Sequence, residues 1–531
     1  MSKIALTHQK AYKWQEHAGV FVKGFVITAE GQLLKGVEMA SYFAHCQNEQ
    51  ELSLALRSAN GLFAVVMQRE DGWIAATDPA RTFPLFYREY DGGCDLSDEV
   101  DALFSPTTQK KMDQKAAHVF RFTGFTIGRS TLLENVSQIQ AGEVVQFQNG
   151  NLKRMFYFRF AQKTENTTYD EAKQQLKKIL HHVGKRLVDL LDGRPVAVPL
   201  SGGYDSRLIV YLLHQQNYQQ VTCFTYGKKQ QNQEINRAQR VAQHFGYPWL
   251  FVEYPTMGTL DLSTDPAFLA YNHFASQYCM KSTLSEYIAA QQLHNRQMLA
   301  PDTVILPGHS GDTIAGSHLR PYMLRYHSNK QVVKDLIYNH FHLFKTHYAD
   351  RRELTVFLND LLEHDDYADL SYPDKVKTWV LRERHGKFII NSCRMWDYMG
   401  WEFLLPLRDK ELVDFFASMP AKYRLHKKLY EDVLWELFKE EGILYEDDLK
   451  SVIPDGWKDR IKLFVKRNLM FYQPYKDIFA HDMIGLQYLL KGMKQEISQR
   501  NVLQDARNIN AIMTEWYLLQ LEKDIEKQNH E

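Results

Sequence analysis

The chain has 531 residues, in which 64 Lys and Arg balance 64 Asp and Glu and 44% of residues are apolar. This composition excludes a disordered chain, and zero formal net charge disfavours a partner held through its phosphate backbone, such as a nucleic acid. At about 100–200 residues per domain the length allows two to four domains, and we expect two.

The cysteines and the N-terminal residues bear on the compartment. The five cysteines are widely spaced and form no CxxC pair, which argues against a disulfide framework and against a cysteine zinc site. The first residues contain no apolar stretch of signal-peptide type, and no window approaches the ~20 apolar residues of a transmembrane helix. We therefore expect a cytoplasmic protein without a transmembrane segment.

Short β-rich runs bounded by Gly, Asp and Asn recur from Gly19 to about Phe160. Residues 142–158 are typical of a hairpin, because the Asn149-Gly150 pair supplies the positive φ angles that a tight turn requires. The first third of the chain is therefore predicted to be mainly antiparallel sheet.

The pattern becomes helical after Thr168, with apolar residues at three- and four-residue spacing from Tyr169 to Asp192. The run PVAVPL at 195–200 is continuously apolar, which indicates a parallel strand buried on both faces, and VTCFTYG at 221–227 follows one helix later. A βαβ unit therefore begins near residue 195. We divide the chain into domains 1–165 and 166–531.

The residues after the first buried strand read Ser201-Gly202-Gly203-Tyr204-Asp205-Ser206 and open a helix. Two glycines let the backbone turn sharply and bring its N–H groups to an anion, and the helix N-terminus adds partial positive charge. Neither GxxxxGK[ST] nor GxGxxG is present. An ordinary strand–turn–helix corner is the alternative, but an Asp available for a metal ion favours a phosphate cradle.

This segment resembles the SGGxDS motif of ATP pyrophosphatases, and its surroundings resemble asparagine synthetase and β-lactam synthetase. Supporting stretches are LPGHSGDTIAGSHL at 306–319, WEFLLPLRDKELVDFFASMP at 401–420 and RLHKKLYEDVL at 424–434. Residues 59–89 resemble the glutaminase domain of the same family. The resemblance implies a nucleophile-aminohydrolase-like antiparallel sheet domain, followed by a parallel-sheet synthetase domain of the adenine nucleotide α-hydrolase type.

The resemblance also implies ATP and Mg²⁺ as cofactors and an amide bond made through an acyl-adenylate, with release of AMP and pyrophosphate. It assigns magnesium to Asp205 and Asp312, and a catalytic lysine to Lys428 rather than Lys427, from register alone. Thr225 and Tyr226 end the second strand, where an open α/β sheet binds ligands, and are expected at the adenosine. The expected nucleotide-binding residues are Leu200, Ser201, Gly202, Gly203, Asp205, Ser206, Thr225, Tyr226 and Gly308.

Departures from the family pattern concern the nitrogen donor. Glutaminases of this family use an N-terminal cysteine, whereas position 2 here is Ser2, and the family's glutamine-holding Asn-Gly-Glu segment is unrecognisable in GFVITAEGQLLKG at 24–36. We therefore expect an N-terminal domain without glutaminase activity. The substrates would be a small carboxylate together with ammonia or an amine.

The loop at 308–317 also departs, because His309 stands where the family has glutamate and Thr313 replaces a second glutamate. His309 could act as a general base on the incoming amine, or it could donate a hydrogen bond within the loop.

Ordinary asparagine synthetase and a catalytically silent nucleotide-binding scaffold remain alternatives. The sequence leaves the oligomeric state open. Residues 456–471 form a basic, amphipathic stretch, which we interpret as a solvated helix rather than a membrane-surface segment.

Overall fold

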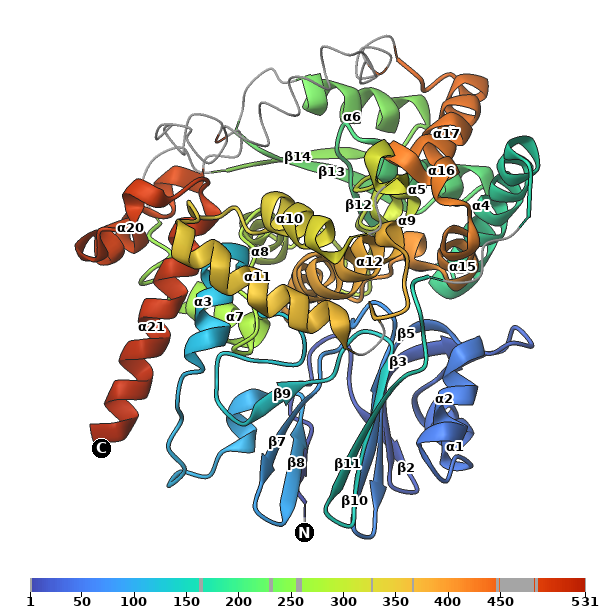
Figure 1. The fold of residues 1–531 in the computed structure, drawn as a ribbon. Coiled ribbons are helices and arrows are strands. Elements are labelled where there is room, and N and C mark those ends of the chain that lie inside the picture. The colour runs from blue at the N-terminus through green and yellow to red at the C-terminus, as the bar shows by residue number, and fades with distance from the viewer. Residues whose placement is uncertain are drawn as a thin grey trace.

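The computed structural model describes residues 2–161, 166–228, 233–254, 260–325, 328–364, 367–445, 448, 482 and 486–530. The basic stretch 456–471 lies outside these residues. Figure 1 shows two domains: mainly antiparallel sheets of the N-terminal domain at one end, and helices around a parallel sheet at the other.

The N-terminal domain contains two sheets. One has the strand order β1-β8-β7-β9, and the other has the order β11-β10-β6-β5-β3-β2 with β4 paired to β3. The strands are β1 (Ile4–Ala5), β2 (Gln15–His17), β3 (Val20–Ile27), β4 (Leu33–Lys35), β5 (Asn60–Arg69), β6 (Gly72–Thr77), β7 (Phe86–Tyr90), β8 (Gly93–Ser97), β9 (Val136–Gln138), β10 (Glu143–Gln148) and β11 (Asn151–Phe156). Two helices, α1 (Gly36–Ala44) and α2 (Glu49–Ser58), accompany the larger sheet.

Side chains from both sheets meet between them. The buried Trp73 on β6 donates its indole N–H to the Cys94 carbonyl oxygen on β8 at 2.7 Å, and its ring lies 5.9 Å from that of Tyr87 on β7. Arg154 on β11 donates to the Tyr87 hydroxyl at 2.8 Å. The predicted hairpin is confirmed, since β10 and β11 pair across Asn149 at φ 51° and Gly150 at φ 74°.

The C-terminal domain holds a parallel sheet of order β14-β13-β12-β15, formed by β12 (Val196–Pro199), β13 (Val221–Gly227), β14 (Trp249–Glu253) and β15 (Val304–Ile305). Both predicted strands are confirmed, and the first is central. The predicted helix after Thr168 is α4 (Tyr169–Leu191). Thr168 and Glu171 cap its N-terminus reciprocally, and Asp192 ends it in a left-handed conformation.

Helices α5 (Tyr204–Gln215) and α6 (Gln233–His244) connect the parallel strands. Further helices of this domain are α7 (Pro266–Ser276), α8 (Tyr287–Asn295), α9 (Gly311–Ala315), α10 (Asn329–His340), α11 (Tyr348–Glu363), α12 (Tyr372–Trp379), α13 (Ile390–Ser392), α14 (Arg394–Met399), α15 (Lys410–Ser418), α16 (Ala421–Arg424), α17 (Lys428–Glu441), α20 (Lys491–Ile497) and α21 (Asn510–His530). A π-helix, Val380–Ile389, continues directly from α12.

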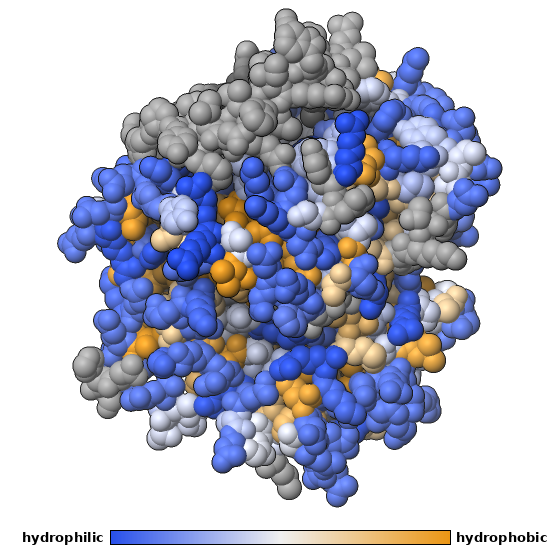
Figure 2. Space-filling model, in the orientation of Figure 1, coloured by the Kyte–Doolittle hydropathy of each residue, from blue (hydrophilic) through white to orange (hydrophobic). Residues whose placement is uncertain are grey.

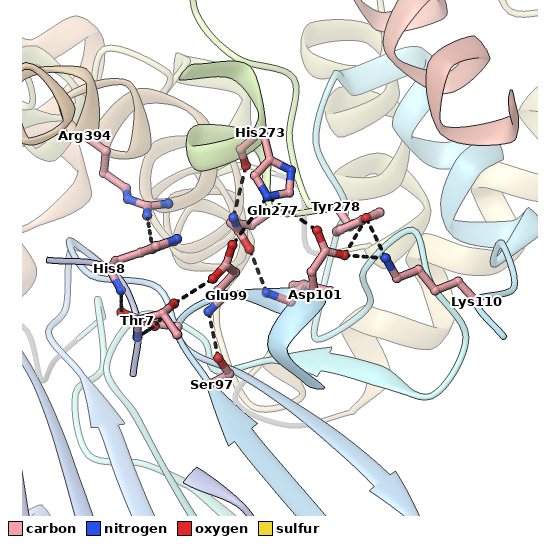
Figure 3. Close-up of polar contacts among 12 residues, drawn as sticks. Thr7, His8, Ser97, Glu99, Asp101, Lys110, His273, Gln277, Tyr278 and Arg394 are labelled. Atoms are coloured by element: carbon pink, nitrogen blue, oxygen red, sulfur yellow. Dashed lines mark hydrogen bonds and ion pairs between the residues drawn. The ribbon is translucent and has the colours of Figure 1, made fainter. Parts of the chain in front are cut away.

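The two domains share an extensive polar interface, part of which Figure 3 shows. Glu99 and Asp101, just after β8, lie 3.4 Å from the Nε2 atom of His273 on α7. Gln277 accepts a hydrogen bond from the Val100 N–H at 2.7 Å, and the Tyr278 hydroxyl donates to Asp101 at 2.7 Å.

A helix of the N-terminal domain lies among the C-terminal helices. This helix, α3 (Gln114–Thr123), packs against α21, where Arg121 forms an ion pair with the buried Glu515 at 2.9 Å (Figure 1). The two domains are therefore interlocked rather than merely joined by a linker.

On the face seen in Figure 2, hydrophilic side chains predominate and apolar ones are scattered between them. None of the helices in the described ranges is long and apolar enough to cross a membrane.

Candidate active site

The predicted phosphate cradle lies between β12 and α5. The Ser201 hydroxyl accepts a hydrogen bond from the Gly203 N–H at 3.2 Å, and the Ser206 hydroxyl accepts one from the Ser201 N–H at 3.1 Å. These bonds close the turn on itself. Gly202 packs closely on α6, since a Cβ at this position would lie 3.0 Å from the Cα of Glu234 and would require a small shift of that helix.

A buried ion pair supports the cradle from behind. Arg207 is fully buried and donates to Asp448 at 2.7 Å and to the Gly202 carbonyl oxygen at 3.1 Å. Arg237 also donates to the Gly202 carbonyl oxygen, at 3.2 Å. Two guanidinium groups thus hold one carbonyl of the turn, which fixes the direction in which the neighbouring N–H groups point. Sequence reasoning missed Arg207 and Arg237.

The second glycine-rich loop brings Asp312 against Asp205. The Asp312 N–H donates to one Asp205 carboxylate oxygen at 3.0 Å, and the Tyr430 hydroxyl donates to the other at 2.9 Å. Burial, followed by the nearby Asp312 charge, raises the pKa of Asp205 to about 7. Gly308 permits this approach, because a Cβ there would lie 2.7 Å from the Ser206 amide nitrogen.

The paired carboxylates fit a magnesium ion. Mg²⁺ prefers oxygen ligands and is commonly held by one or two carboxylates together with substrate phosphates. Burial and the nearby charge of Asp312 raise the pKa of the Asp205 carboxyl. A divalent cation bound beside both carboxylates would stabilise their charged forms. Within the described residues no group of three or more His, Cys, Asp or Glu could hold a metal ion. Two carboxylates are the number of protein ligands with which Mg²⁺ is commonly held when substrate phosphates complete its coordination.

Lys427, not Lys428, lines the cavity at this site. His426 and Lys427 both have left-handed backbone conformations, at φ 52° and 56°, immediately before α17. Burial lowers the pKa of Lys427, but its salt bridge with Glu431 outweighs that effect, and the nearby charges of Asp312 and Asp205 raise the pKa further. The Lys428 side chain is 62% exposed and pairs with Asp432. The sequence-based choice of Lys428 therefore selects the neighbour that lies outside the cavity.

His309 and Glu286 lie together in the cavity wall. The His309 Nε2 atom lies 3.7 Å from the Oε1 atom of Glu286. The Tyr226 hydroxyl donates a hydrogen bond to the same oxygen at 3.3 Å. The second Glu286 oxygen is buried and has no hydrogen-bond partner among the described residues. Next to His309, Ser310 has φ 97°, a strained conformation for a residue with a side chain. Sequence reasoning missed Glu286 and Tyr430.

These elements enclose a cavity of about 540 Å³. Of the sequence-predicted site residues, those lining it are Leu200, Ser201, Gly203, Asp205, Ser206, Thr225, Tyr226, Gly308, His309 and Asp312. Gly202 instead faces α6, and Lys428 lies outside. The cavity thus combines a phosphate cradle, two carboxylates and a lysine at the carboxyl ends of parallel strands, which is where open α/β sheets bind nucleotides.

The N-terminal domain presents no cysteine in an activating environment within the described residues. The Ser2 hydroxyl accepts a hydrogen bond from the Cys94 N–H at 3.3 Å. Burial raises the pKa of the Cys94 thiol and, more modestly, that of the Cys46 thiol, so neither is a ready thiolate.

Comparison with known proteins gives two family matches. Residues 178–450 match the asparagine synthase family, and residues 48–158 match the glutamine amidotransferase domain. No curated protein matches the chain.

Solved structures give only faint likenesses. One is an NH3-dependent NAD synthetase from Campylobacter jejuni, at 14% identity over 40% of this chain and 94% of that chain, with a TM-score of 0.19. Another is a glutamine phosphoribosylpyrophosphate amidotransferase from B. subtilis, at 9% identity over 70% of this chain and 78% of that chain, also with a TM-score of 0.19. Scores this low support no inference.

The asparagine synthase match spans more than half of the chain and includes the cradle, Asp312 and Lys427. The chain therefore belongs to the asparagine synthase family of carbon–nitrogen ligases.

Proposed function

We propose that the protein forms an amide bond through an acyl-adenylate, with release of AMP and pyrophosphate. ATP-dependent amidation is the reaction class of its family. The observation that carries the proposal is the contact between Asp205 and Asp312 beside a glycine-rich turn, within a cavity of about 540 Å³.

A carboxylate is a poor electrophile until one of its oxygens becomes part of a leaving group. In the proposed reaction a substrate carboxylate oxygen attacks the α-phosphorus of ATP, and the bond to the β-phosphate oxygen breaks. The amine nitrogen then attacks the acyl carbon, and AMP leaves with the electron pair of the carbon–oxygen bond. Bound Mg²⁺ would neutralise phosphate charge, with Asp205 and Asp312 as its protein ligands.

The chain's own groups have defined tasks in this scheme. The N–H groups of the turn after β12 and the N-terminus of α5 bind phosphate oxygens. Lys427 neutralises negative charge that develops near the α-phosphate, a role supported by its place in the cavity wall. His309 accepts the proton that the amine releases, and its Nε2 atom has no hydrogen-bond partner among the described residues.

The nitrogen comes from ammonia or an amine rather than from glutamine hydrolysed by the N-terminal domain. Support comes from Ser2 in place of the family's cysteine and from the two buried, unactivated thiols of this domain. The retained domain, residues 1–165 in our division, then serves to hold the synthetase domain, 166–531, through the interface of Figure 3. Five unpaired cysteines fit a reducing cytoplasm.

The test of the adenylation step is exchange of labelled pyrophosphate into ATP in the presence of candidate carboxylates. Asp205→Asn and Asp312→Asn should each reduce the exchange rate by about 10²-fold or more, because both remove charge from the metal site. Circular dichroism provides the folding control. Full exchange in both variants would remove the metal assignment. Aspartate belongs in the carboxylate panel, since asparagine as the product would make ordinary asparagine synthetase the function.

The nitrogen donor is tested by glutamine hydrolysis. A serine hydroxyl needs a positioned base before it attacks an amide, so we expect no glutamate release above background, with or without ATP. Ser2→Ala should leave ammonia-dependent synthesis unchanged. Glutamate release that disappears in Ser2→Ala would restore the N-terminal domain as a working glutaminase.

A further inference from the structure

Glu286 is a buried carboxylate of the cavity wall that the adenylation scheme does not use. It is 9% exposed and lines the cavity together with Tyr226 and His309. Glu286 stands at the N-cap position of α8, where an acidic side chain commonly accepts hydrogen bonds from the first backbone N–H groups of the helix. Its side chain makes no such bond. The carboxylate instead meets the side chains of Tyr226 and His309.

An aromatic pair at the ends of two parallel strands fixes this carboxylate. Tyr226 on β13 donates to the Glu286 Oε1 atom at 3.3 Å, and its ring stacks on that of Tyr254, with the ring centres 5.5 Å apart and the planes at 13°. Tyr254 directly follows β14, and its hydroxyl donates to the Ser285 carbonyl oxygen at 2.5 Å. The side chain of Glu286 and the backbone before it are therefore held in place before any ligand binds.

The charge of Glu286 has little compensation. Among the described residues its ion-pair partner is His309, and no Lys or Arg pairs with it there. Burial raises the pKa of Tyr226 and that of Tyr254, and the Glu286 charge raises both further. An uncompensated carboxylate in a medium of low dielectric is unfavourable. A cation bound in the cavity would compensate it.

Two polar atoms of this pair also lack a hydrogen-bond partner in the described structure. They are Glu286 Oε2 and His309 Nε2, and both are buried. The 3.7 Å between His309 Nε2 and Glu286 Oε1 is too long for a direct hydrogen bond. One ligand nitrogen can, however, lie about 2.9 Å from the imidazole nitrogen and from the carboxylate at once. The His309 side chain is 26% exposed, so a rotation of its ring admits such a nitrogen from the cavity.

The ligands of the proposed reaction differ in how well they fit this pair. A carboxylate and an unprotonated imidazole nitrogen both accept hydrogen bonds, so the ligand atom must carry at least two N–H groups. Phosphates and the substrate carboxylate are anions, which Glu286 repels. The amino group of adenine has two N–H groups but no charge. A protonated amine has both, and an amine with the pKa of a lysine side chain, about 10.4, is almost entirely protonated at neutral pH.

We propose that Glu286 and His309 bind the nitrogen donor, and that this donor enters as an ammonium cation, either NH₄⁺ or a primary alkylammonium group. The inference rests on the proposed function and names the form of its second substrate. An ammonium nitrogen loses two protons when it becomes an amide nitrogen. His309 takes the first proton, which frees the lone pair that attacks the acyl carbon. Glu286 takes the second as the carbon–oxygen bond to AMP breaks, and both protons then pass to solvent.

Donor kinetics test this site separately from adenylation. With a carboxylate that supports pyrophosphate exchange, AMP release is measured at saturating Mg²⁺–ATP against ammonium chloride and against methylammonium chloride. Glu286→Gln keeps an acceptor for the Tyr226 hydroxyl but removes the charge. The KM for the donor should therefore rise about tenfold or more, the loss of one charge-assisted contact. The donor with the lower KM in the unchanged protein distinguishes free ammonium from an amine-bearing substrate.

Two controls accompany this measurement. Pyrophosphate exchange involves no nitrogen donor and should change by less than about twofold in Glu286→Gln. Glu253→Gln, at an exposed position that ends β14, is the matched control and should leave the donor KM unchanged. His309→Gln is a second variant of the site and should reduce donor-dependent AMP release about tenfold or more. Thermal denaturation verifies that each variant is folded.

The pH dependence of the donor KM identifies the form that binds. Between pH 6.5 and 8 the fraction of free amine rises about tenfold per unit, so a site for the cation should keep the KM for total donor within about threefold. Buried groups that interact with the pair keep one protonation state in this range. Burial raises the pKa of Tyr226, Tyr254, Tyr271 and Cys393 and lowers that of His385. A KM that falls in proportion to the free amine would contradict the proposal.

The remaining outcomes separate the two proposals. If no carboxylate supports pyrophosphate exchange, the proposed function itself is wrong. If exchange occurs but the donor KM is unchanged in Glu286→Gln, or if no ammonium compound accelerates AMP release, the donor-site assignment is wrong. It is equally wrong if Glu286→Gln raises only the KM for ATP, because the pair would then contact the amino group of adenine.

Discussion

At the scale of single residues, adjacent lysines before α17 have different environments. Lys427 lines the cavity next to Asp312, whereas Lys428 faces solvent and Asp432. The reason is the backbone: two consecutive left-handed residues turn the chain just before the helix begins. The register of the family's lysine-bearing segment carries no information on this turn, and it therefore selects the lysine that does not line the cavity.

The two lysines make a matched pair of variants. Lys427→Met should lower the rate of pyrophosphate exchange by about 10²-fold, because an ammonium group that stabilises developing charge is replaced by a neutral chain of similar length. Lys428→Met should stay within about twofold of the unchanged protein, since its salt bridge is exposed. Equal losses in both variants would mean that the cavity geometry does not identify the catalytic lysine.

The residues of the cradle could be predicted because the SGGYDS segment is local and follows a buried strand. The residues that hold the cradle in place could not be predicted. Tyr430 contacts Asp205 across 225 residues of sequence, and Arg207 contacts Asp448 across 241. Nothing in the sequence distinguishes such a tyrosine or arginine from the others of its type. Only the folded chain brings it to the site.

At the scale of elements, two glycine-rich loops pack against each other without intervening side chains. The strand–turn–helix unit from β12 to α5 and the hairpin at Asn149-Gly150 follow from short-range patterns, and both are present. The close contact between the loops at Gly308 and Ser206 depends on how β12 and β15 pair, which a single sequence does not reveal.

Gly308→Ala tests this contact. The added methyl group would lie 2.7 Å from the Ser206 amide nitrogen and 2.9 Å from its Cα, so one backbone must move and the carboxylates separate. We expect the affinity for Mg²⁺–α,β-methylene-ATP to fall about tenfold or more, as measured by isothermal titration.

Gly193→Ala is the control, because Gly193 has φ 75° and nothing within 4 Å of its added Cβ. It should cost about 1–2 kcal/mol of stability and leave nucleotide affinity unchanged. An unaltered affinity in Gly308→Ala would show that the two loops can separate without loss of the site.

At the scale of the whole molecule, a buried lysine links the two domains. The Lys281 N–H donates to the Gly124 carbonyl oxygen of the N-terminal domain at 2.9 Å. Its ammonium group lies 4.7 Å from the centre of the Phe388 ring on the π-helix. Its nearest carbonyl partner, that of Ser282, is 3.5 Å away. Burial without a carboxylate lowers the pKa of Lys281 to about 7.

This shift predicts how stability depends on pH. The folded-state pKa of Lys281 lies below the unfolded value of about 10.4, so between these values the unfolded chain binds a proton that the native protein lacks. Unfolding then takes up a proton, and the free energy of unfolding should rise with pH, by up to about 1.4 kcal/mol per unit. Below pH 7 both states are protonated and this contribution levels off.

Lys281→Met keeps the apolar length of the side chain and removes the titrating group. Urea unfolding at pH 7, 8 and 9 should therefore show a smaller slope in Lys281→Met than in the unchanged protein, and greater stability of the variant at pH 7. Because other groups titrate equally in both proteins, the difference between the two slopes isolates Lys281. Identical slopes would mean that this lysine stays charged in the interface, with water or a rearranged Gly124 segment solvating it.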